Sequence, residues 1–306
     1  MLSTLVLGEA LMDCLTQPDG TLLPLMGGSP FNLARAVARQ GAPAGYLSPF
    51  SSDSFGQRLR AQAEADGVQV LRAPSACPTA LAVVTLGAGG QPAYGFYREG
   101  VADRDWQPGA LLAQLRALPV GVLHTGSLML VPPESDKALA VMRGARDLGW
   151  TVSLDVNLRP RLAGDAAAYR AAVMQAVALA DWVKASDEDL HFLGFSDASP
   201  ATAAAVRERF AAPANRRVAL TFGGQGASLW VEGREAAAPA PAVAVVDTVG
   251  AGDTFWGSCL ADWAEGGDAA ARVDATLRRA MTAAALNCTR KGCQPPTRAE
   301  LRAALD

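Results

Sequence analysis

The sequence predicts an α/β fold that combines a mostly parallel sheet, covered by helices on both faces, with a second and smaller sheet. After Trp106, short apolar stretches typical of buried strands alternate with helical stretches, and repeated units of this kind build parallel sheets. Between residues 79 and 98, two β-rich runs follow one another directly, which favours an antiparallel piece. The 306 residues are 50% hydrophobic, enough to fill the core of such a fold.

The parallel sheet is predicted from five apolar strands and the helices between them. We expect strands at residues 5–7, 120–125, 151–156, 182–185 and 218–222, and helices that include residues 135–148 and 166–180. Another helix is expected to begin at Ser29-Pro30, with Ser29 as its N-cap and Pro30 at the first helical position. From residue 252 to 305 the chain is expected to be largely helical, with breaks at residues 266–267 and 292–296.

The smaller sheet is predicted from three segments in the first third of the chain. Residues 10–26 are strand-like and contain a turn at Pro18-Asp19-Gly20. Residues 79–86 and 93–98 are β-rich and are joined by Gly87-Ala88-Gly89-Gly90, which indicates a hairpin. These segments are the only ones whose pattern favours antiparallel pairing, so we expect them to form a sheet separate from the main body.

Composition excludes several classes of partner. With 27 Lys and Arg against 30 Asp and Glu, the net charge is −3, and an acidic chain without basic clusters is a poor candidate for binding nucleic acid. The five cysteines form no CxxC pair, as is typical of a reducing compartment. Glu9 and Asp13 interrupt the first apolar run, and no run reaches the roughly 20 residues of a membrane span. We therefore expect a cytoplasmic protein with no membrane partner.

The most informative segment is a glycine-bearing turn near residue 250. The residues indicate an apolar strand at 243–246, a tight turn with Gly250 and Gly252, and a helix that opens at Gly252-Asp253. Such a turn presents backbone N–H groups and the positive end of a helix dipole, which together bind anions. Asp253 is then either a helix cap or a base beside a bound phosphate. Neither G-x-G-x-x-G nor G-x-x-x-x-G-K-[ST] occurs in the chain.

A second segment narrows the choice. Gly27-Gly28 directly precede a helix whose first turn carries Asn32, an arrangement that alone indicates only a junction between a loop and a helix. Together, Gly-Gly-x-x-x-Asn near residue 30 and Asp-Thr-x-Gly-Ala-Gly-Asp near residue 250 closely resemble the two signatures of the PfkB/ribokinase family of carbohydrate kinases. The resemblance covers nearly the whole chain.

The resemblance implies a Rossmann-like three-layer αβα body and a small β-sheet lid that closes over a sugar. The implied boundaries are residues 1–9, 27–77 and 105–306 for the body, and residues 10–26 and 78–104 for the lid. The resemblance also makes Asp253 the catalytic base, with the backbone of Gly250, Ala251 and Gly252 as the anion hole. Phosphoryl transfer depends mainly on positioning and on charge stabilisation, which such a site supplies.

Substrate-binding residues are implied in three further places. Asp13 matches the aspartate that binds sugar hydroxyls, and Gly27, Gly28 and Asn32 are expected in the same pocket. The run Phe96-Tyr97-Arg98 resembles a stretch of bacterial fructokinases, although Val101 stands where threonine is usual, and it makes Arg98 a candidate substrate contact. Asn157 and Arg159 follow a strand and resemble the D-x-N-x-R run near the phosphates, at the sheet edge where ligands bind.

The nucleotide and metal sites are implied by shorter matches. Residues 184–189 resemble the fructokinase version of the family's N-x-x-E motif, with Ser186 and Asp189 where Asn and Glu are commonest. This makes Asp189 a ligand of Mg²⁺ through water, with neighbouring Glu188 as a substitute, although an acidic first helical turn also explains these residues. The remaining expected contacts are Lys184, Ser186, Thr221, Gly223, Gly226 and Asn287 for ATP, and the backbone of Asp247 for a monovalent cation such as K⁺.

The leading hypothesis is a fructokinase that converts D-fructose and MgATP into fructose 6-phosphate and ADP. A 2-keto-3-deoxygluconate kinase or another PfkB sugar kinase is the alternative within the family, since the former also carries an arginine at the position of Arg98. A non-catalytic sugar-binding protein on this fold is a further alternative, which the intact Gly-Ala-Gly-Asp disfavours. A Rossmann dehydrogenase is disfavoured by the missing G-x-G-x-x-G. The resemblance also predicts a homodimer through the lid.

Overall fold

A computed structural model describes residues 3–86 and 92–306, so the predicted hairpin connection at residues 87–90 lies outside the described residues. The strands are β1 Thr4–Val6, β2 Leu11–Thr16, β3 Leu22–Gly27, β4 Ala44–Tyr46, β5 Gln69–Val70, β6 Ala80–Leu86, β7 Pro92–Tyr97, β8 Val122–Gly126, β9 Thr151–Asp155, β10 Trp182–Ser186, β11 Arg217–Thr221, β12 Ala227–Val231 and β13 Arg234–Ala238. The α-helices are α1 Ser29–Arg39, α2 Ser54–Ala65, α3 Pro108–Arg116, α4 Glu134–Asp147, α5 Ala166–Leu179, α6 Asp187–Leu193, α7 Ala203–Phe210, α8 Ala251–Ala264, α9 Val273–Cys288 and α10 Arg298–Leu305.

The main sheet has nine strands in the order β13-β12-β11-β10-β9-β8-β1-β4-β5. The pairs from β5 to β11 are all parallel, and β12 and β13 add an antiparallel hairpin at one edge. Every residue of β8 is buried, as expected for a strand covered on both faces. The predicted mostly parallel α/β fold is confirmed.

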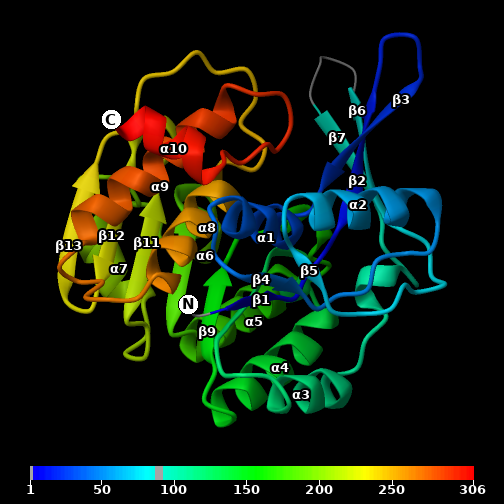
Figure 1. Cartoon of the computed structure of the whole chain (residues 1–306), viewed down its shortest axis with the longest axis horizontal. Coiled ribbons are helices and arrows are strands. Elements are labelled where there is room, and N and C mark those ends of the chain that lie inside the picture. The colour runs from blue at the N-terminus through cyan, green and yellow to red at the C-terminus, as the bar shows by residue number, and fades with distance from the viewer. Residues whose placement is uncertain (1–2, 87–91) are drawn as a thin grey trace.

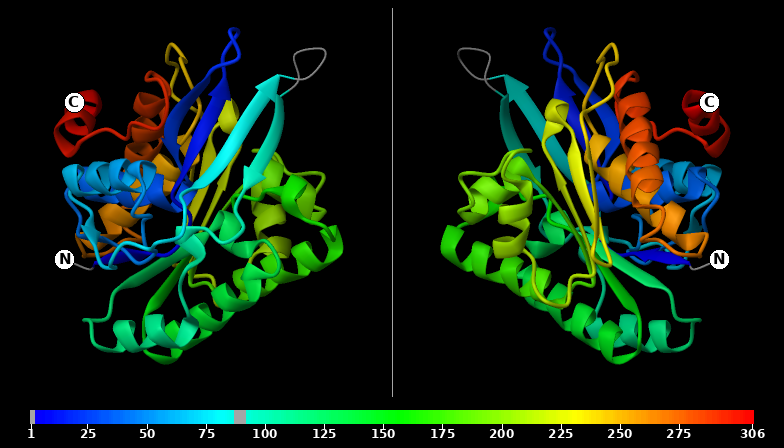
Figure 2. Two further views of the ribbon diagram at one scale, coloured as in Figure 1. Left: turned by 90° about the vertical axis from the view of Figure 1, so that its right-hand side faces the viewer. Right: turned by 90° about the vertical axis from the view of Figure 1, so that its left-hand side faces the viewer.

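Helices cover both faces of this sheet and divide the core into two parts (Figures 1 and 2). Helices α1, α2, α8 and α9 pack over one hydrophobic cluster, and α3, α4, α5 and α7 pack over the other. None of the helices within the described residues has the length and apolar character that crossing a membrane requires.

The smaller sheet stands out from the body beside α2 in Figure 1. Its order is β3-β2-β6-β7, with antiparallel outer pairs and a parallel central pair of β2 with β6. Strand β2 begins within five residues of the end of β1, so the chain passes directly from the main sheet into the smaller one. The predicted small sheet is thus present, and its strands lie within residues 11–27 and 80–97.

Two expectations about strands were wrong. Residues 243–246 form no strand in the described chain, and the side chains of Val245 and Val246 are 62% and 64% exposed. The hairpin of β12 and β13 takes the sheet positions beyond β11, and residues 243–246 run outside the sheet. The same hairpin shows that antiparallel pairing is not confined to the smaller sheet.

Candidate active site

A cavity of about 850 Å³ opens where the carboxyl ends of the central strands meet the smaller sheet. Its lining comes from the loops after β1, β9, β10 and β11, from the start of α8, and from β2, β3 and β7. In an open parallel sheet, ligands bind at this edge because the loops after neighbouring strands converge there. Sixteen of the nineteen predicted site residues line the cavity: Asp13, Gly28, Asn32, Asn157, Arg159, Lys184, Ser186, Asp189, Thr221, Gly223, Gly226, Asp247, Gly250, Ala251, Gly252 and Asp253.

The glycine turn forms the amino-terminal end of α8. Gly250 is the N-cap and has a left-handed backbone, with φ of 75°. A Cβ atom at Gly250 would stand 2.2 Å from Sγ of Cys293, so the turn packs tightly against the chain behind it. The helix then begins at Ala251 and carries Asp253 in its first turn. Backbone N–H groups at such an end have no intrahelical acceptor, which makes this a site for an anion.

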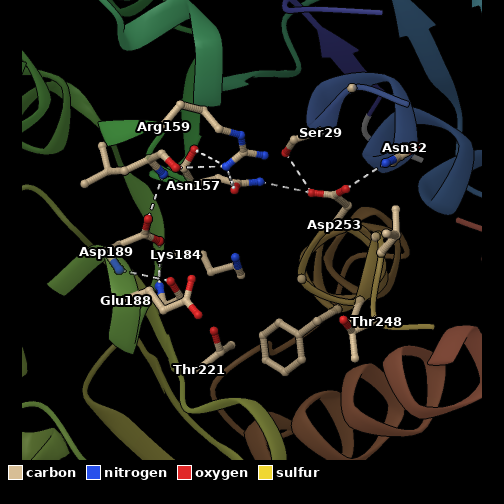
Figure 3. Close-up of a pocket in the computed structure, with 18 of the residues that line it drawn as sticks. Ser29, Asn32, Asn157, Arg159, Lys184, Glu188, Asp189, Thr221, Thr248 and Asp253 are labelled. Atoms are coloured by element: carbon tan, nitrogen blue, oxygen red, sulfur yellow. Dashed lines mark hydrogen bonds between the residues drawn. The ribbon is translucent and has the colours of Figure 1, made fainter. Parts of the chain in front are cut away.

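Asp253 is held by side chains from a distant helix, as Figure 3 shows. The Ser29 hydroxyl donates to Oδ1 at 2.7 Å, and the Asn32 amide donates to Oδ2 at 2.9 Å. Nδ2 of Asn157 lies 3.4 Å from Oδ1 on the other side. A carboxylate has about four lone-pair sites, so capacity remains to accept a proton from a ligand hydroxyl.

The prediction that Ser29 caps α1 was wrong. Gly28 is the N-cap, Ser29 is already helical, and the Ser29 hydroxyl is committed to Asp253. The carboxyl of Glu9 instead accepts the Ser29 backbone N–H at 3.2 Å. Sequence reasoning missed both roles, and the available signal was a charged residue, Glu9, in the loop that follows the buried strand β1.

Burial sets the protonation of these carboxyls. It raises the pKa of Asp253, and the hydrogen bonds from Ser29 and Asn32 offset part of that rise. Burial likewise raises the pKa of Glu9 to about 7 and that of Asp13 to about 6. The guanidinium of Arg159 lowers the pKa of all three carboxyls, which places one cation near the whole acidic group.

Lys184 brings a second cation to the glycine turn. Its Nζ donates to both oxygens of Asp155 at 2.9 Å, and both side chains are buried. Burial alone would lower the pKa of Lys184, but the carboxylates of Asp155 and Asp189 more than offset it, so the pKa is raised. A Cβ atom at Gly252 would stand 3.1 Å from Nζ, so the ammonium lies directly against the turn.

Arg159 is held over the cavity by its own loop. Its guanidinium donates to the side-chain oxygen of Asn157 and to the backbone carbonyls of Asn157 and Leu158. The Arg159 backbone N–H donates to the Tyr169 hydroxyl from α5. These bonds turn Asn157 and Arg159 toward Asp253 (Figure 3).

Asp189 has a structural role. It forms a capping box with Ser186, in which Oδ2 accepts the Ser186 backbone N–H and the Ser186 hydroxyl accepts that of Asp189. Its Oδ1 accepts the Leu158 N–H at 2.7 Å. Glu188 is exposed and lines the same cavity, so its carboxylate is the freer of the two to reach a ligand.

Three predicted residues, all within the described ranges, are not in the lining. Gly27 ends β3 and pairs with Leu11. Arg98 donates to the Leu128 carbonyl at 3.1 Å and lies 4.0 Å from Glu134. Asn287 is fully buried and bridges the Val249 carbonyl and the backbone N–H of residue 294.

The residues of the cavity could hold a metal ion only together with the oxygen atoms of a bound ligand. No group of three or more His, Cys, Asp or Glu side chains among the described residues could hold a metal ion. Magnesium in phosphoryl-transfer sites usually takes one or two carboxylates together with phosphate oxygens and water. Glu188 and Asp189 are compatible with that mode.

Comparison with known proteins places the chain in a family. Residues 2–300 match the pfkB family carbohydrate kinases. The chain belongs to this family. The kinase is 34% identical over 294 residues to a fructokinase of Klebsiella pneumoniae, covering 94% of this chain and 93% of that protein. It is also 33% identical over 297 residues to a fructokinase of Salmonella typhimurium, covering 94% and 93%.

Solved structures share the fold. A fructokinase of Xylella fastidiosa with bound ATP superposes with a TM-score of 0.82 at 28% identity, covering 99% of this kinase and 98% of that chain. An aminoimidazole riboside kinase of Salmonella enterica has a TM-score of 0.80 at 26% identity, covering 99% of both chains. The kinase is therefore a phosphotransferase that acts on a sugar hydroxyl, with the ribokinase-like α/β fold.

Proposed function

We propose that this kinase is a fructokinase, which transfers the γ-phosphoryl group of ATP to D-fructose and releases fructose 6-phosphate and ADP. The observation that supports it best is Asp253, a buried carboxylate in the first turn of α8 that Ser29 and Asn32 hold beside the glycine turn. Fructokinases also stand among the relatives with the highest identity to this chain.

Asp253 is the general base in this proposal. It accepts the proton of the sugar hydroxyl as that oxygen attacks the γ-phosphorus, and the bond to the bridging oxygen of ADP breaks. The backbone of Gly250, Ala251 and Gly252 stabilises the charge on the transferred group, and the Lys184 ammonium adds to this from beside Gly252. The sugar lies between the main body and the smaller sheet, against Asp13, Gly28, Asn32, Asn157 and Arg159.

The nucleotide lies at the other end of the cavity, along Ser186, Thr221, Gly223 and Gly226. Magnesium would be held by the phosphates with Glu188, or with Asp189 through water, and would supply charge neutralisation between the β- and γ-phosphates. A monovalent cation such as K⁺ would bind the backbone of Asp247, whose carboxylate already joins the turn to the N–H of Gly292 at 2.8 Å.

The smaller sheet is the lid of this kinase, and exclusion of water from the transferred phosphoryl group is its role. Leu22 and Tyr97, on its edge strands, are 49% and 64% exposed, which supports a homodimer formed through this sheet. The five cysteines are free, as expected for a protein of the cytoplasm.

A substrate panel tests the choice of sugar. Purified kinase with MgATP is offered D-fructose, D-ribose, 2-keto-3-deoxygluconate and aminoimidazole riboside, and ADP release is followed. We expect the highest kcat/KM with fructose and fructose 6-phosphate as the product by NMR. Turnover of the keto-acid or of the riboside without turnover of fructose would replace the proposed substrate and keep the kinase assignment.

Asp253→Asn tests the base. The amide keeps the size of the side chain, its oxygen can still accept from Asn32, and its NH2 group can donate to the Ser29 hydroxyl. It cannot take a proton, so kcat should fall by about 10²- to 10⁴-fold with little change in KM. The exposed Asp274, in the first turn of α9, supplies a matched control as Asp274→Asn. Full turnover by Asp253→Asn would exclude Asp253 as the base.

A further inference from the structure

The glycine turn rests on a segment that is itself held from the far side by α1. This segment, residues 289–297 between α9 and α10, is called the strap below. Cys293 of the strap lies directly behind Gly250, where a Cβ atom would meet Sγ at 2.2 Å. The strap backbone N–H groups of Gly292 and Gln294 donate to Asp247 and Asn287, and Asn287 in turn donates to the Val249 carbonyl. A displacement of the strap would therefore displace the turn.

Two arginines of α1 hold the opposite side of the strap. Arg35 donates to the Cys293 carbonyl at 3.2 Å, and Arg39 donates to the Pro295 carbonyl at 2.6 Å. These are charge-assisted hydrogen bonds, which are stronger than neutral ones. The two carbonyls that accept these bonds belong to the residues on either side of Gln294.

Asp66, the C-cap of α2, fixes both arginines. Its Oδ2 accepts from Arg35 Nε at 2.6 Å, and its Oδ1 accepts from Arg39 at 2.7 Å. The side chains of Arg35 and Asp66 are only 6% and 3% exposed. Gln62 donates to the same carboxylate, and together these bonds lower the pKa of Asp66 although burial alone would raise it. Arg35 and Asp66 are thus buried as a pair, and Arg39, which is 26% exposed, joins them from the edge of the cluster.

We propose that Arg35, Arg39 and Asp66 are positioning residues that hold the strap, and through it the Gly250–Gly252 turn, in the geometry that receives the transferred phosphoryl group. This inference rests on the proposed phosphoryl-transfer role of that turn. Helix α1 thereby serves the reaction twice, since Ser29 and Asn32 at its start orient Asp253 and Arg35 and Arg39 further along hold the strap behind the anion hole.

Arg35→Gln is the main test, because glutamine cannot bind both Asp66 and the Cys293 carbonyl. We expect KM for ATP to rise about tenfold and kcat to fall about tenfold, with KM for the sugar within about twofold of wild type. If Arg35 only stabilised the fold, its loss would not raise the KM for ATP selectively over the KM for the sugar. The matched control is Arg298→Gln, which removes an exposed ion pair to Glu265 of 2.7 Å length and should leave all three constants within about twofold.

Affinity for a non-hydrolysable ATP analogue, which carries the γ-phosphate that the turn is proposed to receive, is measured by calorimetry without sugar and gives a second readout that does not depend on the identity of the sugar. It should fall about tenfold in Arg35→Gln and in Asp66→Asn, and about threefold in Arg35→Lys, which keeps the charge toward Asp66. If wild type phosphorylates no sugar, the proposed function fails, and the affinity for the ATP analogue still tests Arg35 and Asp66 as positioning residues.

Unchanged affinity for the ATP analogue in folded Arg35→Gln and Asp66→Asn, or an equal rise in KM for ATP and for sugar, would overturn the proposal. If Arg35→Gln does not fold, wild-type affinity for the analogue in Arg35→Lys would overturn it equally.

Discussion

At the scale of single residues, the site depends on how Asp253 is kept ionised in a buried place. Burial raises its pKa, and two donors from α1 lower it again. The Ser29 hydroxyl is the closer donor, at 2.7 Å. A hydrogen bond to a charged group contributes about 1.5–3 kcal/mol. The Ser29 hydroxyl therefore favours the ionised form of the base.

Ser29→Ala should move the acidic limb of the kcat/KM profile to higher pH, because the ionised carboxylate of Asp253 loses a hydrogen-bond donor. The loss of kcat/KM should therefore be larger at about pH 6 than at about pH 8.5. The profile is measured by ADP release across this range. Ser54→Ala is the control, since Ser54 is exposed and holds the equivalent first position of α2. An unshifted limb would contradict this role of Ser29.

At the scale of elements, strands β9 and β10 carry a buried ion pair whose two partners have different duties. Lys184 of β10 reaches the glycine turn, whereas Asp155 of β9 serves to keep that ammonium charged and oriented. Strand order and register produce this pairing, because Lys184 and Asp155 lie opposite each other in the parallel pair of β9 and β10.

Lys184→Met should destabilise the fold by about 3–5 kcal/mol, because it leaves the buried Asp155 carboxylate without its partner. The double variant Lys184→Met with Asp155→Leu should recover most of that loss and none of the activity, since the ammonium beside Gly252 is still absent. Chemical unfolding and kcat are measured on both. Recovery of turnover in the double variant would assign Lys184 a structural role only.

At the scale of the whole molecule, the buried carboxyls of the site make the free energy of unfolding depend on pH. The pKa of Glu9 is raised from 4.5 to about 7 by burial, so the folded state holds this proton more tightly than the unfolded state. The contribution of Glu9 is therefore favourable at low pH and is lost as pH rises through the folded pKa. The shift amounts to about 3 kcal/mol when complete.

Glu9→Gln removes this dependence. Relative to wild type, the variant should gain up to about 3 kcal/mol in unfolding free energy between pH 4.5 and pH 8, because glutamine stays neutral. Urea unfolding at a series of pH values measures the difference. A constant difference between the two proteins across that range would show that Glu9 does not titrate as stated.

The sequence by itself determined the fold class, the smaller sheet and most of the cavity lining. Alternating strands and helices specify a covered parallel sheet, and the two glycine signatures mark the loops that must meet at its carboxyl edge. Local patterns carried this information because strand burial, helix periodicity and turn chemistry act over a few residues. For the same reason they misassigned residues 243–246, which form no strand, while the β12–β13 hairpin takes the sheet positions beyond β11.

Only the tertiary structure decided which polar groups meet across long stretches of chain. Ser29 binds Asp253 across 224 residues, and Arg35 binds the Cys293 carbonyl across 258. Neither contact has a local signal in the sequence. A serine before a proline predicts a helix cap, and an arginine on a helix predicts a charge exposed to solvent. The physical reason is that packing of α1 against α8 and the strap, not the preference of any single residue, sets the geometry of the base and the anion hole.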